Sequence, residues 1–517
     1  MIRVSTKLVL IPTVVTDRNG KRVEDLSEKD FEVLREGRVQ KIGYFKHVKT
    51  STAEMKPAAA LENGATNVVE GNGEARLTIF VMDFLNSSFT EQNTAKEQLL
   101  KFLSKSLDVK EPISLLALDP AGIKVIHDFT TDPQVLADAL KKVTERGSSK
   151  DKPASNPVDD TYRLVAGWNS RSDSRNAAMA QSRLNTLQLA ANSESAAIGE
   201  RVAITLEALR EIGEAFAGIP GRKSMVWATG GFPFEIDDAT TFGLHDRGLL
   251  PAYERAWNAL NRANIAVYPL DVEALVNPAF VSPGIGRPLP QHVHPISTAS
   301  NLERFAEMTG GKFCDRREDA ESCFHEAAND SSDYYLIGIY ESTEDTKPGW
   351  KKLAVRVHRA NLVIRSRTVY YVGPPEDEKK KAKEEIELAL NSPVDYTATP
   401  LAVRWAVSKG AIDAGKKRID FMFVLAPGTA AIDEADNNHM SLEFAALARN
   451  AKGLPMGTFS KAVEGNLAAG IAGDIRAKGV RFPGNMELPS GEFTLTFVVR
   501  DNLSQQLGTV SAAIKVQ

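Results

Sequence analysis

Residues 77–83 constrain the fold of this chain more than any other stretch. They form an uninterrupted apolar run that ends in Asp83, and a polar loop and an amphipathic helical pattern follow. A buried strand that leads directly into a helix is typical of α/β proteins. Ligands of open α/β sheets bind at the carboxyl ends of the strands, so the sequence predicts that Asp83 lies at such an edge.

The length and the charge of the chain limit its organisation and its partners. A chain of 517 residues predicts three or four domains of about 100–200 residues each. The net charge of −4 gives no electrostatic reason to expect nucleic acid as a partner. No apolar run approaches the roughly 20 residues that a membrane-spanning helix needs.

Strand and helix patterns alternate from residue 76 to residue 333. Strand-like apolar runs recur at residues 113–118, 222–228 and 265–270, with helical patterns between most of them. This alternation predicts an α/β domain with a doubly wound, mainly parallel sheet. Residues 147–195 are rich in Ser, Asn, Asp and Ala and are predicted to form an insertion with a short helix near residues 177–189.

Short β segments flank this α/β domain on both sides. Residues 1–48 and 334–372 are each too short to bury a core alone, and we expect them to pair as one β-sandwich. Residues 49–75 lack periodicity and are predicted to be a linker, whereas residues 373–392 are predicted to form a charged helical connector. Several short strands in residues 393–517 predict a C-terminal β-sandwich of immunoglobulin-like type.

Several short motifs are spread over residues 1 to 372. They include Asp83-x-x-x-Ser87, Asp128-Phe-Thr-Thr-Asp132, Pro220-Gly-Arg-Lys-Ser224, Gly230-Gly231 and Thr309-Gly-Gly311. As a set they resemble the acidobacterial branch of von Willebrand factor type A (VWFA) domain proteins. The resemblance implies a Rossmann-like sheet flanked by helices and a role in adhesion or protein–protein binding.

The same resemblance implies a metal-ion-dependent adhesion site. Asp83 and Ser87 match its first loop, and oxygen ligands of this kind suit Mg²⁺ or Ca²⁺. Leu85 replaces the middle hydroxyl residue of the family pattern, and Gly230 stands where the family has an aspartate. The site is therefore expected to be degenerate, and the alternative is that Asp83 bonds loop amides at the start of the following helix. No other cofactor is expected.

The leading hypothesis is a non-enzymatic protein-binding or adhesion-type protein whose partner binds at the carboxyl edge of the central sheet. Its alternatives are a hydrolase or other enzyme that uses the same cleft, and an inert structural protein of the cell envelope. No catalytic residues are assigned. The residues predicted to line the edge are Asp83, Asn86, Ser87, Ser88, Thr229 and Gly230.

Cys314 and Cys323 are the two cysteines of the chain. A disulfide between them is one alternative if the protein is exported, and free thiols are the other. Residues 1–3 lead into no apolar signal core. We therefore expect either an exported protein whose signal peptide is absent from this chain, in the periplasm, at the cell surface or secreted, or a cytoplasmic one. The identity of the partner protein and the oligomeric state are not predicted.

Overall fold

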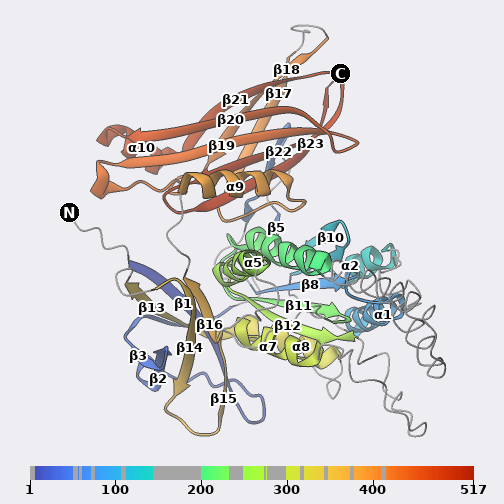
Figure 1. Ribbon diagram of the computed structural model, residues 1–517, viewed down its shortest axis with the longest axis vertical. Coiled ribbons are helices and arrows are strands. Elements are labelled where there is room, and N and C mark those ends of the chain that lie inside the picture. The colour runs from blue at the N-terminus through green and yellow to red at the C-terminus, as the bar shows by residue number, and fades with distance from the viewer. Residues whose placement is uncertain are drawn as a thin grey trace, which may run out of the picture.

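The computed structural model describes most of the chain as three packed parts (Figure 1). The described residues are 6–50, 56–57, 61–70, 76–105, 112–143, 199–231, 248–272, 275, 298–314, 320–342, 347–372, 378–408 and 415–516. The predicted insertion at residues 147–195, with its short helix, lies outside them. No helix within these ranges is long and apolar enough to cross a membrane.

The N-terminal sandwich combines strands from both ends of the first 372 residues. One of its sheets has the order β15-β1-β13-β4 and the other β16-β14-β2-β3, and all of their pairs are antiparallel. The strands are β1 (Thr6–Asp17), β2 (Phe31–Arg35), β3 (Arg38–Gln40), β4 (Ile42–Lys49), β13 (Asp333–Ser342), β14 (Gly349–Val357), β15 (Leu362–Arg365) and β16 (Val369–Val372).

Successive side chains of β1 and β13 point to opposite faces of their sheet, so every second side chain faces the other sheet of the sandwich. Val9, Ile11 and Ile337 point into the core between the two sheets. The side chains on the other face of the same strands are also largely apolar. They are buried at one end of that face and exposed at the other. The hairpin between β2 and β3 turns at Glu36-Gly37. The φ angles of these two residues are 50° and 75°, the positive values that a tight hairpin turn needs.

The central part is built on a five-stranded sheet of order β10-β9-β8-β11-β12. Strand β8 runs parallel to β9 and β11, β11 runs parallel to β12, and β10 is antiparallel to β9. Each of the strands β8, β9, β11 and β12 has seven consecutive buried residues, because helices cover both faces of the sheet. The strands are β8 (Leu77–Asp83), β9 (Ile113–Asp119), β10 (Gly122–Thr130), β11 (Lys223–Thr229) and β12 (Ile265–Asp271).

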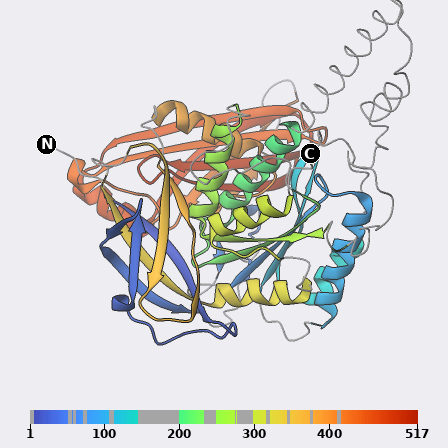
Figure 2. The same ribbon diagram turned by 60° about the horizontal axis from the view of Figure 1, so that its bottom comes forward.

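Helices cover the two faces of this sheet separately. One face packs against α1 (Phe89–Lys105), α2 (Pro133–Lys141) and α8 (Ala320–Ser332). The other packs against the helical residues 199–216, α5 (Leu250–Arg262) and α7 (Thr298–Thr309). Figure 2 shows helices of this second group between the central sheet and the C-terminal strands.

The C-terminal sandwich has two antiparallel sheets, β21-β18-β17-β6 and β20-β19-β22-β23. Helix α9 (Glu378–Asn391) packs on the second sheet through buried Ala382 and Ala389, and Arg500 Nε lies 2.8 Å from Glu385 Oε2. The strands are β6 (Gly64–Thr66), β17 (Leu401–Val407), β18 (Lys417–Leu425), β19 (His439–Asn450), β20 (Pro455–Asn466), β21 (Val480–Leu488), β22 (Gly491–Asp501) and β23 (Gln506–Val516), with α10 (Ala469–Lys478) between β20 and β21.

Residues 49–75 were predicted to be a linker, yet part of them belongs to the C-terminal sandwich. Strand β6 pairs with β17. The side chain of Asn67 donates to the carbonyls of Tyr396 at 2.6 Å and Thr399 at 3.0 Å, and it accepts from the amide of Leu401 at 2.7 Å. The pairing was missed because three residues carry no readable alternation.

The fold class predicted from the sequence was wrong. Five of the six sheets in the described residues contain only antiparallel pairs, and parallel pairing is confined to β8, β9, β11 and β12. The chain is mostly β, with the character of packed sandwiches, and is not a mainly parallel, doubly wound Rossmann-like VWFA fold. The prediction gave too much weight to the apolar run at residues 77–83. The short strands before and after the central part contribute more of the sheet structure.

Candidate functional site

Asp83 ends β8 and lies inside the protein. Its side chain is 1% exposed. Residues 77–83 place it there because their apolar side chains are buried on both faces of the sheet, which brings the last residue of the strand to the carboxyl edge. Phe84 and Leu85, which follow, are themselves core residues on opposite faces of the sheet.

The carboxylate of Asp83 accepts four hydrogen bonds from this chain. Oδ1 accepts from the Asn86 amide at 2.9 Å. Oδ2 accepts from Asn86 Nδ2 at 3.0 Å, from Trp227 Nε1 at 3.2 Å and from Thr229 Oγ1 at 2.8 Å. Burial raises the pKa of Asp83, and the hydrogen bonds from Asn86, Thr229 and Trp227 act in the opposite direction. The side chain thus ties the loop after β8 to the end of β11.

Ser87 and Gly230 extend this network across the two strand ends. The Gly230 amide donates to Ser87 Oγ at 2.8 Å. A Cβ atom at Gly230 would lie 2.0 Å from Glu91 Oε2, so no side chain fits there without displacing Glu91. Glu91 Oε2 accepts from the Ser88 amide at 2.7 Å and caps the start of α1.

The structure brings the six predicted edge residues together, but it buries five of them. Asp83, Asn86, Ser87, Thr229 and Gly230 are buried, and Ser88 is half-buried. Their polar groups bond mostly to one another. In this arrangement they stabilise the carboxyl edge, and a partner could contact Ser88 and the neighbouring Phe89, which is 49% exposed.

The residues at this edge do not fit the predicted Mg²⁺ or Ca²⁺ site. Both Asp83 oxygens are already occupied by donors, and Ser87 Oγ accepts from a backbone amide. Asn86 Oδ1 is the one buried oxygen of this loop without a donor among the described residues. One neutral oxygen falls short of the six to eight oxygens that calcium prefers. Nowhere in the described residues do three His, Cys, Asp or Glu side chains gather as ligands.

The structure joins Cys314 and Cys323 by a disulfide, with 5.8 Å between their Cα atoms. Cys314 follows α7 and bridges to Leu270 of β12, whereas Cys323 lies in α8. Both are buried in the core on the α1 and α8 side of the central sheet. The bond therefore clamps α8 to the outer strand of that sheet.

The outer face of the N-terminal sandwich carries an exposed apolar surface that sequence reasoning did not single out. Leu8, Tyr44 and Tyr340 are 38%, 40% and 55% exposed. Leu8 pairs with Tyr340 across β1 and β13, and Tyr44 pairs with Gly338. We call these three side chains the Leu8–Tyr44–Tyr340 patch.

Glycines let the members of this patch lie close together. A Cβ atom at Gly338 would be 2.9 Å from Tyr44 Cβ and 3.0 Å from Leu8 Cδ1, so both side chains lean over this glycine. The ring of Tyr340 lies over Gly43, whose Cβ position is 2.3 Å from Tyr340 Cε2. The signal in the sequence was residues 334–340, which contain no charged residue and are apolar on both faces of the strand.

The other end of the same sheet face is covered by the central part. Tyr334 is buried, and its hydroxyl accepts from the Arg222 amide at 3.0 Å. Val14 and Val48 pack around Tyr334. The face therefore passes from buried to exposed along β13, and the patch lies at its exposed end.

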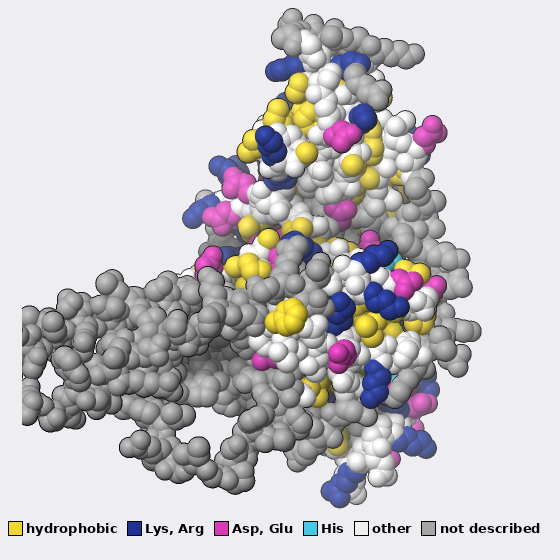
Figure 3. All heavy atoms as spheres, turned by 90° about the vertical axis from the view of Figure 1, so that its right-hand side faces the viewer, with side chains coloured by type: hydrophobic (Ala, Val, Ile, Leu, Met, Phe, Trp, Pro, Cys, Tyr) yellow, Lys and Arg dark blue, Asp and Glu magenta, His cyan; other side chains and the backbone are white. Residues whose placement is uncertain are grey.

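The side of the molecule toward which β8, β11 and β12 run shows no such concentration of one kind of side chain. Figure 3 views this side, and the basic and acidic side chains of the described residues are interspersed on it. The described residues on this side therefore offer a strongly charged partner no surface of a single sign.

Comparison with known proteins assigns no family to the chain. No protein-family model matches it, and no curated protein matches it. A solved structure that matches is the pilus adhesin SpaC from Lactobacillus rhamnosus GG in its open conformation, with 8% sequence identity and a TM-score of 0.27. The match covers 97% of this chain and 58% of that adhesin.

A likeness at this level carries no argument about fold or function. The resemblance to VWFA proteins stays a prediction from the sequence motifs, because none of these comparisons bears on it. What defines the class is the architecture itself, a mostly β protein with two sandwiches packed against a central five-stranded sheet and its helices.

Proposed function

We propose that this chain is a non-enzymatic, adhesion-type protein that binds another protein through the Leu8–Tyr44–Tyr340 patch. The observation that carries the proposal is the contiguous exposure of two tyrosines and a leucine on a flat sheet face. Tyrosines are enriched in protein–protein interfaces, where the ring buries apolar area and the hydroxyl finds a polar partner. Exposed apolar patches on soluble domains mark such surfaces.

The rigidity of the patch supports the same proposal. Its central strand, β13, is paired on both sides, by β1 and β4, and the opposite face of β13 packs in the sandwich core through Ile337 and Ile339. A surface that is already ordered loses little conformational entropy when a partner binds.

A second surface at the carboxyl edge of the central sheet has a specific observation in its favour. Phe89 begins α1 beside Ser88 and is half-exposed. It is a single aromatic side chain, whereas the patch presents three adjacent apolar side chains. The patch is therefore the first surface to test, and Phe89 supplies the comparison.

We also propose that the protein is exported. The Cys314–Cys323 disulfide supports this, because disulfides persist in oxidising compartments and are rare in the cytosol. Thiol titration of protein purified from its source under alkylating conditions tests it. No free thiol is expected, and two free thiols per chain would contradict export.

Site-specific photo-crosslinking tests the binding surface. The full chain carries a photo-crosslinking amino acid in place of Tyr340 and is exposed to surface proteins of its source cells. A discrete adduct is expected that disappears when Tyr44→Ser and Leu8→Ser are added. The matched control carries the same crosslinker in place of Thr458 on β20, far along the chain from the patch. Adducts that are equal at both positions would contradict the proposal.

A further inference from the structure

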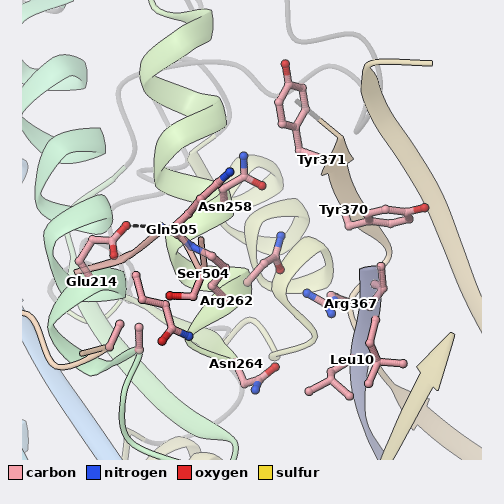
Figure 4. A pocket seen from close by; sticks show the side chains of 16 residues that line it. Leu10, Glu214, Asn258, Arg262, Asn264, Arg367, Tyr370, Tyr371, Ser504 and Gln505 are labelled. Atoms are coloured by element: carbon pink, nitrogen blue, oxygen red, sulfur yellow. Dashed lines mark hydrogen bonds and ion pairs between the residues drawn. The ribbon is translucent and has the colours of Figure 1, made fainter. Parts of the chain in front are cut away.

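A cavity of about 280 Å³ lies where the three parts of the chain meet (Figure 4). Leu8 and Leu10 of β1 form part of one wall, and the loop between β22 and β23 adds Ser504 and Gln505. Polar side chains from α5 and the turn after it face this wall, namely Asn258, Asn261, Arg262 and Asn264. Arg367, from the loop between β15 and β16, completes the lining.

Arg367 is a buried cation without a partner among the described residues. It is 7% exposed, and its Nε atom has no acceptor there. Burial lowers the pKa of Arg367 to about 10, so the guanidinium still carries its charge at neutral pH. A buried charge is costly unless it is paired, and proteins keep such groups where a ligand or a partner group completes them.

The other buried arginines of the described residues show what Arg367 lacks. Arg210 pairs with Glu207, and Arg500 pairs with Glu385. Arg222 donates to the Tyr268 hydroxyl at 3.1 Å and to the Gly310 carbonyl at 2.6 Å. Arg367 has no equivalent acceptor, so its guanidinium fork is available from the cavity.

The cavity contains a carboxylate, but Arg367 does not use it. Glu214 forms an ion pair with Arg262 on α5. With that pair neutral, the described lining retains one positive charge, which belongs to Arg367. Figure 4 shows its guanidinium on the side of the cavity that faces Arg262 and Asn264.

Three carboxamides lie on the wall formed by α5. Asn258 and Asn261 are three residues apart and so share one face of the helix, and Asn264 follows in the turn. Carboxamide nitrogens donate hydrogen bonds, and a guanidinium binds carboxylate or phosphate oxygens through two parallel hydrogen bonds. Leu8 and Leu10 add apolar contact beside these donors.

We propose that this cavity binds a small organic molecule through an oxyanion, a carboxylate or a phosphate group, that pairs with Arg367. The asparagines of α5 donate to the remaining oxygens, and the apolar part of the ligand contacts Leu8 and Leu10. The site adjoins the exposed patch, because Leu8 belongs to both, but the buried position of Arg367 admits a small ligand more readily than the surface of a folded protein.

Titration calorimetry of the full chain at constant ionic strength tests the proposal. The probes are inorganic phosphate, acetate and benzoate. At least one is expected to bind at millimolar concentration or below. Tighter binding of phosphate than of acetate assigns a phosphate-bearing ligand, and the reverse order assigns a carboxylate-bearing one. Tighter binding of benzoate than of acetate is expected from the wall that contains Leu8 and Leu10.

Variants locate the binding. Arg367→Met is expected to fold, because it removes an unpaired buried charge, and to weaken binding at least tenfold. Asn261→Leu, at a half-buried position, is expected to weaken binding several-fold. Arg359→Gln is the matched control, since Arg359 is exposed and pairs with Asp25 away from the cavity. Failure of all three probes to bind the native chain, or equal affinity of Arg367→Met and the native chain, would overturn the proposal.

Discussion

At the scale of single residues, two buried aspartates show how surroundings decide what a carboxylate does. Asp83 is surrounded by neutral donors, and burial raises its pKa. Burial would also raise the pKa of Asp330, but the charges of Arg365 and Arg22 outweigh it and hold that pKa below its ordinary value. The sequence could not separate the two cases, because Arg22 is 308 residues from Asp330 along the chain.

Asp330 links the central part to the N-terminal sandwich and predicts how stability changes with pH. Arg365 donates to its two oxygens at 2.8 and 3.0 Å, and the Tyr268 hydroxyl donates at 2.6 Å. Asp330→Asn should lower the free energy of unfolding at neutral pH by about 3–5 kcal/mol, because it removes the charge partner of Arg22 and one of the two carboxylates that pair with Arg365, the other being Glu326.

The pH window follows from the lowered pKa of Asp330. The carboxylate contributes its stability above the pKa of the unfolded chain and loses it as pH falls through the folded pKa. The difference between native and Asp330→Asn protein, measured by denaturant unfolding, should therefore shrink on acidification. Asp25→Asn is the control, since its pair with Arg359 is exposed to solvent and should contribute little to stability. A difference that is constant with pH would contradict this account.

Asp83→Ala tests whether the carboxyl edge of the central sheet is structural or binds metal. The change removes the acceptor for Trp227, Thr229 and Asn86, so we expect a loss of about 2–4 kcal/mol in the free energy of unfolding. Titration calorimetry of chelator-treated native protein with Mg²⁺, Ca²⁺ and Mn²⁺ should show no heat that depends on Asp83. Micromolar binding that Asp83→Ala abolishes would show that a cation displaces these internal donors.

At the scale of elements, local patterns predict strands and helices well but not their partners. Residues 77–83 form β8 because a continuous apolar run needs cover on both faces. Residues 335–340 of β13 pair with residues 8–13 of β1, and only the need for a larger core indicated that pairing. Strand β6 has three residues, and its pairing depends on Asn67, whose contacts lie more than 300 residues away along the chain.

Asn67→Ala measures what that contact contributes. The change removes three hydrogen bonds to the start of β17 and the segment before it. The Thr399 carbonyl and the Leu401 amide lose their side-chain partner, whereas the Tyr396 carbonyl still accepts from the Thr509 amide at 3.0 Å. We expect thermal unfolding to show a loss of about 2–3 kcal/mol. Glu62→Ala, at an exposed position in the same segment, should change stability by less than about 0.5 kcal/mol. Equal effects of both variants would mean that β6 is not held by Asn67.

At the scale of the whole molecule, the parts share cores. The cluster on one face of the central sheet includes Trp227 and Leu260 together with Tyr396, Val498 and Leu507, which belong to the C-terminal sandwich and the segment leading to it. Arg210 on the helix between them donates to the Tyr396 hydroxyl at 2.9 Å. Local patterns could not reveal these shared cores. The sequence therefore predicted the central α/β part as the defining domain with β-sandwiches at its flanks, and this fold class was wrong for a chain that is mostly β.

The same scale explains why the sequence and the structure point to different candidate binding surfaces. The residues predicted to meet a partner, such as Asp83 and Thr229, are polar and follow buried strands, but the fold turns them inward. Leu8 and Tyr340 were read as strand residues with a buried side. Whether an apolar sheet face is covered depends on how far the central part reaches along β13, which no local pattern records.

One measurement tests the central proposal most directly, the affinity of the full chain for the protein recovered by crosslinking at position 340. It compares Tyr340→Ser in the patch with Phe89→Ser at the carboxyl edge of the central sheet. The account predicts at least a tenfold loss for Tyr340→Ser, since exposed tyrosines at interface centres carry much of the binding energy. It predicts native affinity for Phe89→Ser. A loss with Phe89→Ser and native affinity with Tyr340→Ser would contradict it.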